Sequence, residues 1–289
     1  MKTLNIIGAG RLGKTLGRLW QQAGFFQIQS IHNRTIDSAH AAVEFIGAGQ
    51  ATSSIESMAD ANCWLISCSD GEIETAAEQL SSNFQQREGA IAFHCSGALS
   101  SKVLKALHPA SIASAHPVHS FADPQRSLDS LGGSSVALEG DSLAVLTLTE
   151  AFASIGCGTL AISAEHKSLY HAGSVIACNY LTTLIDLSLQ SFAAAGIDRD
   201  RALRLLEPIV LQTVKNTMAL GPEASLTGPI ARGDLETVAT QAKSLTSADP
   251  HLAHHYRQLG LACVKLARRG QLSDETAAKL IELLSEPMR

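Results

Sequence analysis

A glycine-rich hexapeptide near the N-terminus constrains the fold of this chain more than any other feature. It fits the pattern G-x-G-x-x-G and consists of Gly8, Ala9, Gly10, Arg11, Leu12 and Gly13. Gly8 permits a tight turn, Gly10 lets the backbone approach a pyrophosphate, and Gly13 lets the following helix pack close to the strand. The motif follows an apolar run and opens a helical pattern, which is the context of a dinucleotide-binding turn. A glycine-rich turn without a ligand is the alternative.

Apolar runs alternate with helical patterns through the first half of the chain. Helical spacing occurs at residues 11–23, 36–46, 72–80 and 100–107. Strands are predicted at residues 4–7, 27–31, 63–67, 90–93, 112–115, 135–138 and 159–162. Such alternation is typical of α/β proteins, so we predict a doubly wound, mostly parallel Rossmann sheet with helices on both faces.

The strand pattern ends near residue 162, and the remainder reads as helices. We therefore predict a dinucleotide-binding domain at residues 1–162 and an all-helical domain at residues 163–289. A long helix over residues 163–195 is apolar on nearly all sides, which predicts that it is buried. The residues placed to cap later helices are Asp198, Asp234, Asp249 and Ser273.

The second predicted strand is followed by Asn33, Arg34 and Thr35, where NAD enzymes usually carry an acidic residue for the ribose 2′-hydroxyl. A guanidinium at Arg34 can instead bind a 2′-phosphate through two hydrogen bonds, and Thr35 and Ser38 can add hydroxyl donors. This sequence favours NADP(H) over NAD(H) as the cofactor. A solvated surface arginine is the alternative for Arg34.

Polar residues follow the next three strands, where parallel sheets bind their ligands. Ser69 and Asp70 follow the third strand and Ser96 follows the fourth, so we expect all three beside the cofactor, with the nicotinamide near Asp70 and Ser96. His94 and His116 are candidates for substrate binding. Loop histidines are as often capping or packing residues, and that alternative stays open for both.

Three polar residues interrupt the long apolar helix. Lys167 and His171 are one turn apart and share a face, and Asn179 lies toward the same side. Reduction of a carbonyl needs a hydrogen-bond donor or a proton at the oxygen, which Lys167 or His171 could give, while Asn179 could orient substrate or cofactor. A solvated lysine, a core histidine and a structural asparagine are the alternatives. Arg232 could bind a substrate carboxylate or pair with Asp234 or Glu236.

Composition excludes several classes of function. The net charge of −5 disfavours binding to a nucleic acid backbone. The six cysteines form no CxxC pair and the histidines have no HExxH spacing, so we expect reduced thiols and no metal site. No signal-peptide pattern is present, and the apolar stretch over residues 172–189 contains too many polar residues for a membrane span. We therefore expect a cytoplasmic protein without a membrane partner.

Several stretches together resemble the Rossmann-like proteins that carry a C-terminal DUF2520 domain. They include residues 8–13, 33–35, 94–98, 116–117, 171–179 and 226–234. These proteins are distant relatives of the 6-phosphogluconate, 3-hydroxyacid, pyrroline-5-carboxylate and ketopantoate reductases. The resemblance implies an NADP-dependent oxidoreductase that forms a homodimer through its helical domain. The superfamily pattern places an Asn four residues after a catalytic Lys, whereas this chain has His171 at that position.

Three functions are compatible with these features. The leading hypothesis is NADPH-dependent reduction of a small 2-oxo acid, with ketopantoate to pantoate implied by the resemblance as the best single reaction. A second hypothesis is imine reduction of the pyrroline-5-carboxylate type. A third is an NADP-binding sensor or regulatory protein without turnover.

Overall fold

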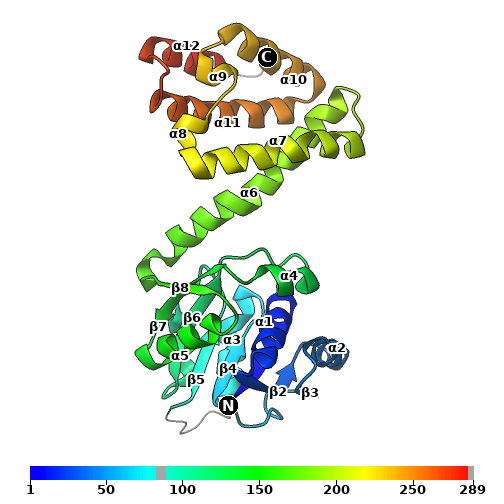
Figure 1. The fold of residues 1–289 in the computed structure, drawn as a ribbon, viewed down its shortest axis with the longest axis vertical. Helices are drawn as coiled ribbons and strands as arrows, with labels where there is room; N and C mark the ends of the chain where they lie inside the picture. Colours follow the sequence, from blue (N-terminus) through cyan, green and yellow to red (C-terminus); the bar gives the residue numbers. More distant parts are fainter. Residues whose placement is uncertain (83–88, 286–289) are drawn as a thin grey trace. The chain divides into compact units, whose positions relative to one another are not determined.

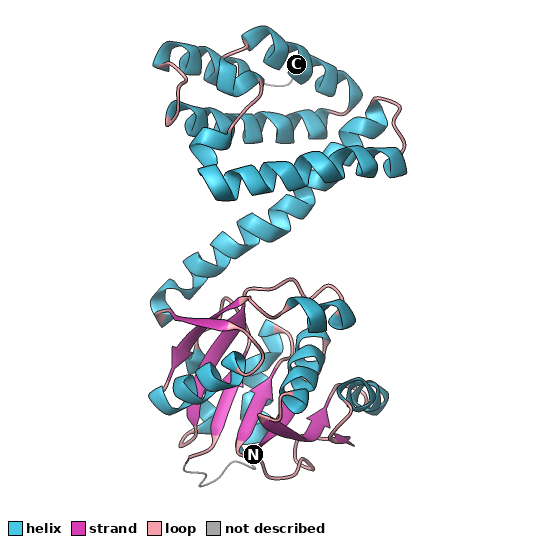
Figure 2. Ribbon diagram, in the orientation of Figure 1, coloured by secondary structure: helices cyan, strands magenta, loops and turns pink. Residues whose placement is uncertain are grey.

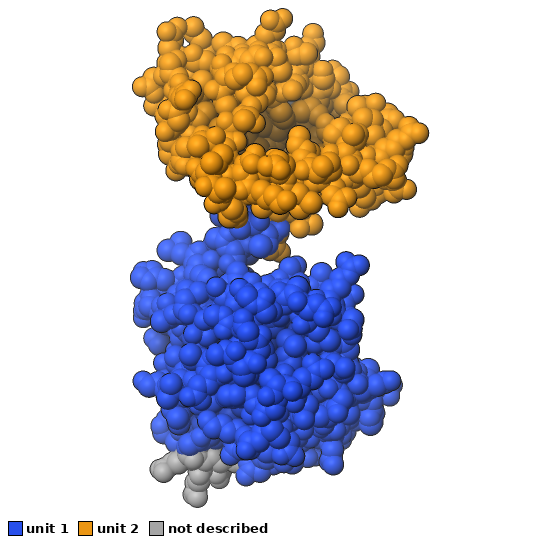
Figure 3. Space-filling view, in the orientation of Figure 1, with its two compact units in different colours: residues 1–178 blue, residues 179–289 orange. Residues whose placement is uncertain are grey.

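The computed structural model describes residues 1–82 and 89–285, and the chain divides into two compact units. The first unit is Met1–Cys178 and the second is Asn179–Arg289 (Figure 3). The division falls inside one long helix, α6 (Lys167–Ala194), so each unit contains part of it. The boundary between residues 162 and 163 stays a prediction about the sequence domains.

One mostly parallel sheet forms the centre of the first unit (Figure 1). Its strands are β1 (Lys2–Ile7), β2 (Phe26–His32), β3 (Gln50–Thr52), β4 (Cys63–Ile66), β5 (Ile91–His94), β6 (Ser111–Pro117), β7 (Ser135–Gly140) and β8 (Gly158–Ala161). They lie in the order β3-β2-β1-β4-β5-β6-β7-β8, and only the β6–β7 pairing is antiparallel. The chain reverses its direction of travel across the sheet between β1 and β4, which is where doubly wound sheets open a ligand crevice.

Helices cover both faces of this sheet, as predicted (Figure 2). The helical elements of the first unit are α1 (Arg11–Gln22), α2 (Ile36–Ile46), α3 (Asp70–Ser81), the 3-10 helix η1 (Ser101–Leu107), α4 (Pro124–Ser130), α5 (Ser142–Ala153), the short η2 (Ala164–His166) and the start of α6. One apolar core joins α1, α2 and α5 to the sheet, and a second joins α3 and η1 to its other face. The predicted doubly wound α/β fold is confirmed.

Trp20 of α1 is the centre of the first core. Its side chain is fully buried and its ring packs edge-on against Phe26, Phe93 and Phe152, with centroid distances of 5.3, 6.1 and 5.2 Å. Its indole N–H donates to the Ala151 carbonyl at 2.9 Å, so the polar atom of this large side chain is satisfied. Trp20 thereby fixes α1, and the glycine motif that precedes it, against the sheet.

The regular elements described in the second unit are all helices. After the end of α6 come α7 (Arg199–Leu220), α8 (Pro222–Ser225), α9 (Pro229–Arg232), α10 (Leu235–Ala248), α11 (Pro250–Arg268) and α12 (Asp274–Ser285). The predicted caps are present, because Asp198, Asp234, Asp249 and Ser273 each accept a hydrogen bond from a backbone amide in the first turn that follows. A small core that includes Ile230, Val264 and Leu280 joins α9 to α12.

The prediction that the long helix is buried is wrong within this chain. Large apolar side chains of α6 are exposed, including Leu169 at 74%, Ile176 at 61% and Tyr180 at 56%. Segment Ala164–Ala194 is also, among the described residues, long and apolar enough to cross a membrane by length and composition, which alone is weak evidence. A pattern that is apolar on all sides indicates that a helix needs a covering surface, and within each unit the described residues leave these side chains exposed.

Candidate active site

The glycine motif forms the tight turn that its sequence predicts. Gly8 has a φ of 80°, and a side chain there would meet the Cys68 backbone nitrogen at 2.5 Å. The Gly10 amide donates to the Gly8 carbonyl at 2.7 Å, and α1 then begins at Arg11 without a side-chain cap. The amides of Arg11, Leu12 and Gly13 are therefore free to bind an anion at the positive end of the helix.

Asn33 links this turn to the end of β2. Its Oδ1 accepts from the Ala9 amide at 2.6 Å, and its Nδ2 donates to the carbonyl and the hydroxyl of Ser38 at 2.9 and 3.0 Å. The side chain is buried and its hydrogen bonds are within the protein. Asn33 therefore braces the turn, and its predicted contact with the cofactor stays a prediction.

The neighbouring residues Arg34 and Thr35 differ in their surroundings. The Thr35 hydroxyl caps α2 by accepting from the Ser38 amide at 3.3 Å. Arg34 is exposed and lines a cavity of about 340 Å³ beside the glycine turn, together with Gly8, His32 and Glu72. The cavity lies at the carboxyl ends of β1 and β2, so a guanidinium is placed where a ribose phosphate of a bound dinucleotide would need it.

Asp70 and Ser96 meet at the ends of β4 and β5. The Ser96 hydroxyl donates to Asp70 Oδ2 at 2.8 Å and accepts from the amides of Ala98 and Leu99 at 3.2 and 3.0 Å. Ser69, directly before α3, donates its hydroxyl hydrogen to Glu72 at 2.7 Å. The structure thus brings Asp70 and Ser96 together as expected. The Ser69 side chain is bound to Glu72 in the first turn of α3.

His94 is fully buried and supports the loop after β5. Its Nδ1 accepts from the Ser96 amide at 3.1 Å, and its Nε2 then donates to the Ser100 carbonyl at 3.2 Å. Burial lowers the pKa of the imidazole to about 4. Both ring nitrogens are occupied, so the arrangement favours the packing alternative over substrate binding.

Lys167 is 1% exposed, and its ammonium group is held between the middle of β6 and the loop that follows β5. It donates to Ser114 Oγ at 2.7 Å and to the Ser96 carbonyl at 3.2 Å. Burial lowers its pKa, while the charge of Glu139 raises it. An ammonium group has three N–H donors, so one is left for a ligand.

Glu139 and Ser114 complete the surroundings of this lysine. They are register partners on β7 and β6, and the Glu139 carboxylate accepts from the amide and the hydroxyl of Ser101 at 2.5 and 2.9 Å. A buried carboxylate with these bonds offsets part of the cost of burying the ammonium. The sequence analysis missed both residues, since only the pairing of β6 with β7 brings them to Lys167.

Two histidines and a tyrosine lie next to Lys167. His116 Nδ1 is 2.9 Å from the Tyr170 hydroxyl, and the His116 ring packs edge-on against both Tyr170 and His171. Burial lowers the pKa of His116 to about 4, helped by the charges of His171 and Lys167. His171 Nδ1 is buried without a hydrogen-bond partner among the described residues. Both imidazoles face Gly97, where an added methyl group would collide with them.

Two predicted residues are in the second unit. Asn179 is exposed on α6, and its carbonyl accepts from the Thr183 hydroxyl at 3.2 Å. Arg232 is exposed at the end of α9, where its charge helps to lower the pKa of Asp234, after the hydrogen bonds from Thr237. The residues that the structure brings together in the first unit are Asp70, Ser96, Gly97, Ser114, His116, Glu139, Lys167, Tyr170 and His171; we call them the lysine site.

No group of three or more His, Cys, Asp or Glu side chains able to hold a metal ion occurs within residues 1–82 and 89–285. The lysine site itself offers a buried ammonium, the neutral imidazole of His116 and a phenol. Such a set can donate hydrogen bonds to an oxygen that gains negative charge.

Two family profiles match the chain. That of the Rossmann-like domain matches residues 2–117, and that of a domain of unknown function, DUF2520, matches residues 134–263. The chain is therefore a Rossmann-like protein with a C-terminal DUF2520 domain, as its motifs predicted. No curated protein sequence matches it.

Solved structures share the fold over almost the whole chain. A Bacteroides fragilis protein described as an NADP oxidoreductase is 20% identical, with a TM-score of 0.78 and coverage of 93% of this chain and 98% of that chain. A Thermotoga maritima protein is 26% identical, with a TM-score of 0.71 and coverage of 92% and 98%. A Coxiella burnetii pyrroline-5-carboxylate reductase is 16% identical, with a TM-score of 0.59 and coverage of 98% of both chains.

Acid should destabilise the first unit through His94. The pKa of its imidazole is lowered to about 4 in the folded protein, from an ordinary value of roughly 6.5, so protonation favours the unfolded chain. The folded protein keeps its full stability with respect to His94 above pH ~6.5, where the imidazole is neutral in both states. It loses stability as the pH falls from there toward 4. We expect the free energy of unfolding, measured with urea, to fall by up to about 3 kcal/mol over this interval because of His94.

The substitution His94→Gln keeps an amide donor for the Ser100 carbonyl but cannot titrate. It should weaken the pH dependence of the unfolding free energy, leaving the part that His116 contributes in the same direction, because the pKa of His116 is also lowered to about 4. His40→Gln, at an exposed histidine of α2, is the matched control and should retain the full dependence. An identical pH dependence in His94→Gln and the parent protein would refute this account of His94.

Proposed function

We propose that this chain, in which a Rossmann-like domain precedes a DUF2520 domain, is an NADP(H)-dependent reductase of a small 2-oxo acid, with ketopantoate to pantoate as the leading reaction. The observation that carries the proposal is the buried ammonium of Lys167 with one N–H left for a ligand, on the same edge of the sheet as the glycine turn. The reduced cysteines of the described chain agree with a cytoplasmic location.

The proposed cofactor site is the glycine turn with the cavity beside it. The free amides at the start of α1 suit a pyrophosphate, and Arg34 suits a 2′-phosphate. The similar Bacteroides fragilis protein is described as an NADP oxidoreductase, which supports the same cofactor here. When bound, the reduced nicotinamide supplies a hydride.

In the proposed reaction, Lys167 hydrogen-bonds the carbonyl oxygen of the substrate. As the carbonyl carbon is reduced, the electron pair of the C=O π bond would move to the oxygen, and the Lys167 ammonium would give that oxygen a proton. Ser114 and the Ser96 carbonyl hold the ammonium in place, while Glu139 favours its charged form. His171 is the second candidate for the proton donor, because its Nδ1 has no hydrogen-bond partner in the part of the chain that the structure describes.

Imine reduction is the second candidate function. The similarity to a pyrroline-5-carboxylate reductase favours it, since that substrate contains a C=N bond. The buried ammonium favours the carbonyl substrate instead, because it stabilises a developing alkoxide and repels the cation of a protonated imine. An NADP-binding sensor without turnover is the third candidate, and it requires no function of Lys167.

Oxidation of NADPH should separate these candidates. We expect turnover with 2-oxo acids, ketopantoate first, and little with a cyclic imine. Lys167→Met should lower kcat by ~100-fold or more, because the donor to the oxygen is lost, and should change the Kd of NADPH by less than about 3-fold. His171→Ala should also lower kcat more than NADPH affinity, and Lys105→Met, at an exposed lysine of η1, is the control.

Each other outcome selects a different function. Turnover of the imine alone would replace the carbonyl substrate, and tight NADPH binding without any turnover would support the sensor. Equal kcat for Lys167→Met, His171→Ala and the parent protein would overturn the proposed roles of both residues.

Arg34 and Asn33 should affect cofactor binding in different ways. Arg34→Ala should weaken NADPH binding by ~30-fold and leave NADH binding nearly unchanged, because a charge-assisted contact contributes about 2 kcal/mol. Asn33→Ala should weaken both cofactors to a similar extent, because it releases the Ala9 amide that holds the turn. Calorimetric titration with both cofactors measures this, and a loss of NADPH affinity no larger than that of NADH in Arg34→Ala would exclude a 2′-phosphate contact.

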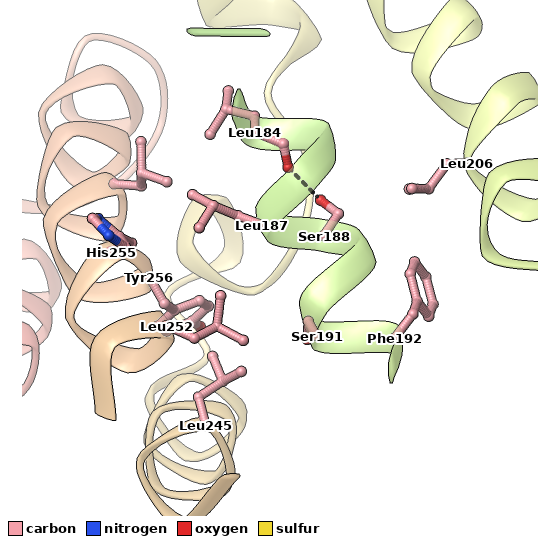
Figure 4. A pocket seen from close by; sticks show the side chains of 11 residues that line it. Leu184, Leu187, Ser188, Ser191, Phe192, Leu206, Leu245, Leu252, His255 and Tyr256 are labelled. Carbon is pink, nitrogen blue, oxygen red and sulfur yellow. Dashed lines mark hydrogen bonds between the residues drawn. The ribbon is translucent and has the colours of Figure 1, made fainter. Parts of the chain in front are cut away.

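We also propose that the helical unit forms a homodimer. A groove of about 400 Å³ between α6, α7, α10 and α11 is lined by apolar side chains, among them Leu184, Leu187 and Leu252 (Figure 4). Exposed apolar side chains continue along α7, including Ile209 and Leu211. Exposed apolar surface is typical of an interface, and we propose that a second copy covers it.

Leu184→Glu should shift the protein from dimer to monomer in analytical ultracentrifugation, because it places a charge in the groove. Leu146→Glu is the matched control, since Leu146 is an exposed leucine on α5 of the first unit. A parent protein that sediments as a monomer, or a Leu184→Glu variant that stays dimeric, would contradict an interface at this groove.

A further inference from the structure

The hydrogen bond between His116 and Tyr170 joins two elements that are far apart in the sequence. His116 is near the end of β6 and Tyr170 is in the first turn of α6, and the distance from His116 Nδ1 to the phenol oxygen is 2.9 Å. Both side chains are partly buried, so the bond is sheltered from water. Neither residue has yet a role in the proposed reaction.

The surroundings of the phenol indicate which partner donates. Ser174, one turn further along α6, lowers the pKa of the Tyr170 phenol by hydrogen bonding. Burial acts more strongly and raises that pKa, which keeps the phenol protonated. The phenol hydrogen is then available for His116 Nδ1, and a phenol is a stronger donor than a neutral imidazole.

A proton donated to Nδ1 fixes the tautomer of His116. The imidazole is neutral, since burial and the neighbouring charges of His171 and Lys167 lower its pKa to about 4. A neutral imidazole that accepts at Nδ1 carries its own hydrogen on Nε2. His116 Nε2 has no hydrogen-bond partner among the described residues and faces Gly97, beside Lys167.

We infer that Tyr170 is a positioning residue that holds His116 as its Nε2–H tautomer, and that this N–H is a second donor, besides Lys167, to the carbonyl oxygen of the substrate. His116 is then a catalytic residue that stabilises the developing negative charge without giving up its proton, and Lys167 remains the proton donor. Neutral imidazoles are suited to this task. The inference rests on the proposed reduction of a carbonyl group.

Two isosteric substitutions of His116 separate this role from simple packing. The amide nitrogen of Gln lies near the position of Nε2, whereas the amide oxygen of Asn can lie near the position of Nδ1 and accept from Tyr170. His116→Gln can therefore still donate to the substrate, whereas His116→Asn can only keep the bond to Tyr170. We expect kcat to fall less than about 10-fold in His116→Gln and ~100-fold in His116→Asn, with KM and the Kd of NADPH changing far less.

Tyr170→Phe removes only the hydroxyl group and should lower kcat by ~10-fold through loss of the fixed tautomer. His119→Gln and His119→Asn are the controls, because His119 lies in the next loop and hydrogen-bonds Ser127 instead. Both should retain the parent kcat. An equal or smaller loss of kcat in His116→Asn than in His116→Gln would overturn the inference.

The tautomer itself can be measured without turnover. Long-range 1H–15N correlation spectra of the histidine side chains, assigned with His116→Gln, should show a hydrogen on Nε2 in the parent protein and a mixture of tautomers in Tyr170→Phe. A hydrogen on Nδ1 in the parent protein would overturn the inference. A parent protein with the expected tautomer that reduces no 2-oxo acid would overturn the proposed function instead, so the two failures are distinguishable.

Discussion

The buried ammonium of Lys167 is the interaction on which the rest of the lysine site depends. Its bonds to Ser114 and to the Ser96 carbonyl attach the start of α6 to the middle of β6 and to the loop after β5. Because Tyr170 and His171 follow on the same helical face, that attachment also sets their positions against His116 and Gly97. A cation is costly to bury, and Glu139 offsets part of this cost. The proposed stabilisation of a negatively charged oxygen requires that Lys167 keeps this positive charge.

The glycine turn and the cavity beside it, where we propose the cofactor binds, depend on a hydrogen bond between uncharged groups. Asn33 joins the end of β2 to the amide of Ala9, so the turn that would receive the pyrophosphate is rigid before a ligand arrives. Arg34, the next residue, is exposed and free to respond to the cofactor. The buried Asn33 thus fixes the conformation of the turn, and the exposed Arg34 beside it would select NADP(H) over NAD(H). The switch point between β1 and β4 places both halves on one edge of the sheet.

Local patterns predicted the fold well, and long-range contacts limited the prediction of the site. The glycine motif, the strand periodicity and the helix caps depend on neighbours in sequence, and each was confirmed. Strand β3 is too short to show a pattern, and α4 and α5 were also missed. Ser114, Glu139 and Tyr170 join the site only through strand pairing and helix docking. The expected burial of α6 failed because a helix that is apolar on all sides need not find its cover within one chain.

A crystal structure of the protein with bound NADP+ would test whether the lysine site performs the reduction. We expect the pyrophosphate over the amides at the start of α1, the 2′-phosphate at Arg34, and the nicotinamide ring beside Ser96 with its reactive carbon open to Lys167. A nicotinamide ring held away from the ends of β5 and β6, with Lys167 still closed off from it, would contradict the assignment of this site to reduction.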